Sequence, residues 1–92
     1  MTDHLPHATH PEIVKRLKRA NGHLLSVISM IEAQRPCVDL AQQLHAVEKA
    51  IAQAKRTLIQ DHIDHCLDAV LAAPKDESAR TISDFKDITK YL

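Results

Sequence analysis

The sequence has very few of the residues from which turns and aromatic cores are built. Among 92 residues there is one glycine, one phenylalanine, one tyrosine and no tryptophan. Tight β-hairpin turns depend on residues that adopt positive φ, glycine above all, so this composition argues against a sheet of hairpins. Apolar residues still make up 45% of the chain, and most of them are alanine, isoleucine, leucine and valine. We therefore expect an all-α protein.

Long apolar runs are also missing. No stretch is long enough to span a bilayer, and the start of the chain lacks the basic-then-apolar pattern of a signal peptide. We expect a cytoplasmic protein without a membrane partner, in which Cys37 and Cys66 are thiols or thiolate ligands and not a disulfide. A phosphate-cradling glycine loop and a nucleotide fingerprint are absent too. We expect neither an enzyme nor a small-molecule substrate.

A first helix is predicted from Thr9 to Gln34. Thr9 and Glu12 form the T-x-x-E pattern of a capping box, with Pro11 at an early helical position. Pro36 disfavours the helical conformation at the residue before it, so the helix should end near Gln34. Apolar residues spaced alternately four and three apart predict a heptad seam. The seam residues are Ile13, Leu17, Ala20, Leu24, Val27 and Ile31.

A second, unusually long helix is predicted up to Pro74. About 35 residues at 1.5 Å each give a rod of ~50 Å, which needs partners along its length. Its seam residues are Leu40, Leu44, Val47, Ile51, Ala54 and Leu58. A short third helix is marked by Ile82, Phe85, Ile88 and Leu92. We expect residues 1–8 to be a flexible arm and residues 9–92 to be a single helical domain.

Cys37, His62 and Cys66 are the candidate metal ligands. His62 and Cys66 are four residues apart, so they share one helical face. Two thiolates and an imidazole suit copper(I), nickel, cobalt or zinc. Cys37 lies 25 residues before His62, and a continuous helix would hold the two ~37 Å apart. One chain cannot close this site, so we expect a metal that bridges two antiparallel copies.

A plainer interpretation of the same residues stays open. The cysteines could be small buried hydrophobes and His62 a core histidine. His4 and His7, in the predicted arm, are further candidate ligands, because imidazole binds metals at cellular pH and a mobile arm could fold over a site. The alternative for these two histidines is a solvated tail.

Charge is unevenly distributed along a chain whose formal net charge is zero. Residues 1–36 carry five Lys or Arg against three acids, and residues 60–92 carry four against seven. The basic half could meet an anion, although a solvated helix face is the simpler explanation of any one charge run. The two basic groups are Lys15, Arg16, Lys18 and Arg19, and then Lys49, Lys55 and Arg56.

Three sequence blocks carry a resemblance to a known family. They are RLKRANGH at 16–23, AQQLHAV at 41–47, and DHI at 61–63 followed by Cys66. Together they resemble the CsoR/RcnR family of small all-helical repressors, over about residues 10–92. The resemblance implies an antiparallel dimer with a four-helix-bundle-like core. Two such dimers would form a homotetramer that binds operator DNA without metal and releases it on binding metal, derepressing a metal exporter.

The resemblance also implies roles for particular residues. Cys37, His62 and Cys66 match the three central ligands of the family, and His4 or His7 is placed to supply the fourth ligand of its nickel and cobalt members. The residues expected to neutralise DNA phosphates are Arg16, Arg19, Lys49, Lys55 and Arg56.

Departures from the family pattern bear on the inducer. The copper branch tends to have a tyrosine where Pro36 stands and a glutamate near Ile82 or Ser83, and the formaldehyde branch tends to lack a cysteine at the position of Cys66. We therefore favour nickel or cobalt over copper(I) or zinc. The alternatives are a copper(I)-sensing repressor, a formaldehyde or persulfide sensor acting through Cys37, and a metal-binding or helical interaction protein that does not bind DNA.

Overall fold

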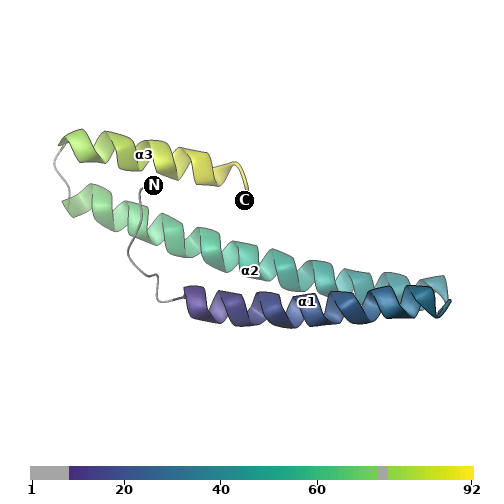
Figure 1. Ribbon diagram of the computed structural model, residues 1–92. Helices are drawn as coiled ribbons and strands as arrows, with labels where there is room; N and C mark the ends of the chain where they lie inside the picture. The colour runs from purple at the N-terminus through teal and green to yellow at the C-terminus, as the bar shows by residue number, and fades with distance from the viewer. Residues whose placement is uncertain (1–8, 73–74) are drawn as a thin grey trace.

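Three helices make up most of the protein. The computed structural model describes residues 9–72 and 75–92, which contain α1 (His10–Glu32), α2 (Cys37–Ala72) and α3 (Lys75–Thr89) (Figure 1). The all-α prediction is confirmed, and each helix lies where the sequence predicted it. No helix within these two ranges is long and apolar enough to cross a membrane.

The long helix α2 is the axis of the molecule. α1 packs antiparallel along the first part of α2, and α3 folds back along its last part (Figure 1). In the described residues α1 and α3 contact α2 and not each other. The molecule is 59 Å long and 23 by 18 Å across, because a helix of 36 residues alone spans ~54 Å. Residues at the two ends of α2 are therefore far apart.

The contact between α1 and α2 is a narrow core with a seven-residue repeat. Ile13, Ala20 and Val27 of α1 are buried, and so are Val47 and Ala54 of α2. Beside this core, His23 Nε2 lies 2.6 Å from Gln43 Oε1, a hydrogen bond that joins α1 to α2. Alternate heptad positions thus meet the neighbouring helix as predicted.

Five of the other seven seam residues stay exposed in the single chain, and each of them is at least 38% exposed. They are Leu17 and Ile31 on α1 and Leu44, Ile51 and Leu58 on α2. Leu24 and Leu40 are partly buried. Two helices bury only one side of each seam, so five residues of the predicted core lack cover within one protomer.

The predicted capping box at the start of α1 is wrong. Thr9 adopts helical φ and ψ of −85° and −17°, and its side chain makes no cap hydrogen bond. A capping hydroxyl reaches the amides of the first turn from an extended backbone, so a helical Thr9 cannot use it. Its carbonyl instead accepts a hydrogen bond from the Ile13 amide at 3.0 Å. Glu12, the other half of the pattern, lies beside Arg16.

The end of α1 is a Schellman motif built without glycine. Gln34 has a φ of 60°, in the left-handed region. Its amide donates to the Ile31 carbonyl at 3.0 Å, and the Arg35 amide donates to the Met30 carbonyl at 3.1 Å. Pro36 follows at once, and its carbonyl accepts the first backbone bond of α2. The predicted end of the helix near Gln34 is confirmed.

Replacing Gln34 with glycine is expected to stabilise the fold by about 1 kcal/mol, because glycine adopts positive φ without the Cβ clash that a glutamine has there. Thermal or urea unfolding of the metal-free protein measures this. The matched control is Gln42→Gly in the exposed interior of α2, which should destabilise by about 1 kcal/mol. A loss of stability in both variants would contradict the left-handed conformation at Gln34.

Candidate metal and nucleic-acid sites

His62 and Cys66 lie one turn apart on the part of α2 that α3 covers. Cys66 is 6% exposed, and it borders a cavity of about 310 Å³ between the two helices. The cavity's accessible surface is entirely apolar, and its other lining residues are Leu67, Ile82, Phe85 and Lys86. The Cys66 sulfur is therefore held in apolar surroundings, within one turn of an imidazole.

His62 faces a different set of α3 residues. It is half-buried and lines a cavity of about 270 Å³ together with Asp84, Asp87, Ile88 and Tyr91. Carboxylates beside a metal-binding histidine commonly accept its second N–H and fix the orientation of the ring. The family pattern places a glutamate near Ile82 or Ser83, and the sequence did not predict a role for the two aspartates that follow. Their spacing with Ile88 and Tyr91, three or four residues apart on one helical face, was the available signal.

Cys37 lies at the opposite end of the molecule. It is the first residue of α2 and is exposed, ~37 Å from His62 at helical rise. Within one chain, the described residues contain no group of three or more His, Cys, Asp or Glu side chains placed to hold a metal. The chain thus brings His62 and Cys66 together and leaves Cys37 apart. The predicted arm ligands His4 and His7 lie outside the described residues.

His65, the other histidine of this region, points elsewhere. Its Nε2 lies 4.0 Å from Asp61 Oδ1, and its side chain is 45% exposed. It follows His62 by three residues and directly precedes Cys66, so its side chain cannot share the Cys66 direction. The exposure of its side chain places His65 on a solvated face of α2.

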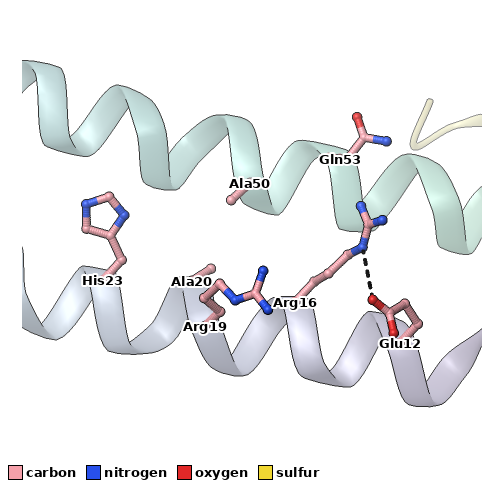
Figure 2. Close-up of a pocket in the computed structure, with 7 residues that line it drawn as sticks. All are labelled: Glu12, Arg16, Arg19, Ala20, His23, Ala50 and Gln53. Atoms are coloured by element: carbon pink, nitrogen blue, oxygen red, sulfur yellow. Dashed lines mark ion pairs between the residues drawn. The ribbon is translucent and has the colours of Figure 1, made fainter.

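A second candidate site lies between α1 and α2. Arg16 extends from α1 toward Gln53 of α2, Arg19 and the small residues Ala20 and Ala50 lie farther along the helices, and His23 lies at the other end (Figure 2). We call this the α1–α2 groove, a hollow of about 300 Å³ lined by these residues and Glu12. Two guanidinium groups face one carboxylate there, so the groove suits an anion.

Three further basic residues were predicted to contact nucleic acid, and the structure separates them. Arg56 Nη2 donates to Gln53 Oε1 at 3.2 Å, which places Arg56 at the rim of the groove. Lys49 precedes Gln53 by one helical turn and shares its side of α2. Lys55 follows Gln53 by two residues and therefore points to another side. Arg16 and Arg19 line the groove, Arg56 contacts its residue Gln53, and Lys49 and Lys55 are not among its lining residues.

The protein combines a sulfur and nitrogen donor pair beneath α3 with a basic groove between α1 and α2. These are features of a metal-responsive regulator. The chain belongs to the family of metal-sensitive transcriptional repressors, the CsoR/RcnR family, whose sequence profile matches residues 9–91. It is accordingly a regulator and not an enzyme.

Several curated proteins are similar to the chain. It is 35% identical to the copper-sensing transcriptional repressor CsoR of Bacillus subtilis over 81 residues, which cover 86% of this chain and 80% of that protein. It is 33% identical to CsoR of Mycobacterium ulcerans over 78 residues, 85% of this chain but only 65% of that longer protein. The copper-sensing repressor RicR of Mycobacterium tuberculosis is 33% identical over 58 residues, 63% of this chain and 60% of that protein. No solved structure matches the chain.

Proposed function

We propose that the chain is a copper(I)-responsive repressor that binds operator DNA in its metal-free form and releases the DNA when copper(I) binds. The observation that carries the proposal is the donor pair of His62 and Cys66, placed together on α2 beneath α3. A repressor acts on DNA, so the proposed location is the cytoplasm. The expected consequence of release is transcription of a metal exporter.

Assembly is part of the proposal, because one chain offers only two of the three donors in one place. A second, antiparallel copy would bring its Cys37 to the His62 and Cys66 of the first. The exposed seam residues, such as Ile51 at 46% and Leu17 at 42%, support this arrangement, since burying such rows is what a bundle of four helices does. A homodimer of this kind, paired again into a homotetramer, is the proposed assembly.

The choice of copper(I) has two supports. The relatives reported above are named for copper sensing, and two thiolates with one imidazole are a donor set that fits copper(I). The apolar surroundings of Cys66 fit the same ion, because copper(I) prefers soft sulfur ligands and needs no oxygen donor beside them. Nickel or cobalt, favoured by the sequence, depends on His4 and His7, and zinc has no specific support. When bound, the metal would supply a bridge between two copies.

DNA binding is proposed to rest on Arg16, Arg19 and Arg56 at the α1–α2 groove, with Lys49 and Lys55 as phosphate contacts outside it. Positive side chains of this kind neutralise phosphates and supply affinity more than sequence specificity. The metal acts through a coupling free energy between two sites, so DNA must weaken metal binding by the same factor by which metal weakens DNA binding. Residues of α2 contribute to both the α1–α2 groove and the donor pair, so α2 is the element proposed to carry this coupling.

A thiol sensor of the same fold is the second candidate. Cys37 is exposed while Cys66 is buried, so Cys37 is the thiol that formaldehyde or a persulfide would reach first. Such a sensor needs Cys37 but does not need an imidazole at ligand distance. His62 therefore distinguishes the two functions.

The test is release from promoter DNA, followed by gel shift with a duplex from the promoter of an adjacent exporter gene. Copper(I) should release the unmodified protein. His62→Ala should still bind the duplex and should not be released by copper(I), because one of three ligands is gone. The matched control His65→Ala should respond normally. Full release of His62→Ala would contradict the ligand assignment, and release by formaldehyde alone would establish the thiol sensor.

A further inference from the structure

Glu12 is the acidic member of an otherwise basic groove. Its Oε1 lies 4.0 Å from Arg16 Nε, one helical turn along α1 (Figure 2). The two side chains are 61% and 43% exposed, so the pair is solvated and contributes little to stability. Since the pair does little for the fold, its main consequence is electrostatic. The Glu12 carboxylate is paired with the Arg16 guanidinium, which an incoming anion would otherwise bind.

The rest of the groove is arranged for an anion. Arg19 also lines it and forms no ion pair within the described part of the chain. On the α2 side, Gln53 Oε1 already accepts a hydrogen bond from Arg56, so its amide nitrogen is the atom that can donate to a ligand. Near the other end, the hydrogen bond between His23 and Gln43 fixes the spacing of the two helices. Glu12 is the acidic group among the lining residues.

We propose that Glu12 is an internal competitor for Arg16, which a phosphodiester group of duplex DNA displaces when it enters the α1–α2 groove. This rests on the proposed function, because it assumes that the protein binds DNA. Arg16 exchanges one anion for another when DNA arrives. Its contact with Glu12 is a single approach of 4.0 Å at Nε, whereas a phosphate free to orient itself can accept two parallel hydrogen bonds from the guanidinium. Glu12 thereby lowers affinity for any phosphate backbone and keeps the repressor easy to release.

The experiment is a double-mutant cycle on DNA affinity, measured by fluorescence anisotropy with a labelled promoter duplex and the metal-free full chain. Glu12→Gln should tighten binding by about two- to fivefold, the range that exposed ion pairs produce. Arg16→Ala should weaken binding and lower the slope of log affinity against log salt by roughly one unit. In the Arg16→Ala background, Glu12→Gln should give almost no gain.

Glu32→Gln is the matched control. Glu32 is an exposed carboxylate in the last turn of α1, ~30 Å along the helix from Glu12, and its removal changes net charge by the same amount. An equal gain from both variants would overturn the proposal in favour of a general charge effect. An undiminished gain of Glu12→Gln in the Arg16→Ala background would overturn it too, since Glu12 would then repel DNA directly.

Two further measurements distinguish other reasons for which the proposal could fail. Inorganic phosphate at constant ionic strength should compete weakly with the duplex, and strong competition would mean that the groove serves free phosphate. If the unmodified protein binds neither the promoter duplex nor an unrelated duplex at low salt, the proposed function fails and not the role of Glu12. Thermal unfolding of each variant checks that the fold is retained.

Discussion

Mixing two inactive variants is expected to restore metal binding. Cys37→Ala and His62→Ala should each lose copper(I) binding on their own, because every site then lacks one ligand. In a mixed dimer, one site carries both substitutions and the other carries neither. Random mixing should recover about a quarter of the unmodified capacity, since half of the dimers are mixed and each holds one intact site. Anaerobic copper(I) titration against a chelator, after co-refolding, measures this capacity.

The control for this experiment pairs His62→Ala with Cys66→Ala. Both substitutions lie on the same contributing segment of α2, so every site of a mixed dimer has one defect and no capacity should return. Recovery in this pair would place His62 and Cys66 in different sites. No recovery in the first pair, with dimers confirmed by light scattering, would mean that Cys37 is not supplied by a second copy.

The helices were predictable because their signals are local. Pro36 and Pro74 delimit α2 in the sequence, and an uninterrupted apolar period of three and four lies between them. The predicted separation of Cys37 from His62 follows from helical rise alone. These are properties of one helix, and one sequence is enough to read them.

The misses concern contacts between helices or the exact backbone angles of one residue. Thr9 matches a capping pattern, but its φ and ψ are helical and its hydroxyl is buried. Asp84 and Asp87 come near His62 only because α3 folds back over α2 at one particular register. At that register Phe85 and Ile82 line the cavity beside Cys66, a pairing of helices that no local pattern specifies. The exposed seam residues have no cover within the single chain, so a second copy is proposed to cover them.

The groove shows the same division. Arg16 and Arg19 stand out in the sequence as a basic run, yet the run does not say which side chains of α2 they meet. The structure joins them with Gln53, a neutral residue that no charge count would select, and separates Lys55 from them. Charge patterning thus predicted a basic surface, and helix packing determined its members.

Deleting residues 1–8 is expected to leave copper(I) binding and copper(I)-triggered release of DNA unchanged. Two thiolates and one imidazole complete a trigonal copper(I) site, so the arm has no ligand to add. Nickel(II) usually takes a further nitrogen or oxygen ligand in a tetragonal arrangement. The surface of the cavity beside Cys66 is apolar. We expect Asp84 and Asp87, which line the cavity beside His62, to orient the imidazole and not to bind the metal. A nickel response is therefore expected to depend on His4 or His7, and we expect nickel(II) to release little DNA from either form of the protein.

Titrations of the full and truncated chains, followed by thiolate-to-metal charge-transfer absorption and by gel shift, decide between the two metals. A full-length variant with both His4→Ala and His7→Ala is the matched control, because it removes the imidazoles without shortening the arm. Nickel(II) or cobalt(II) release that is present in the full chain and lost in both altered forms would make copper(I) the wrong inducer. Cys37, His62 and Cys66 are proposed ligands for either metal, so only the histidines of the arm distinguish a nickel(II) site from a copper(I) site. Copper(I) is the inducer for which the arm is dispensable.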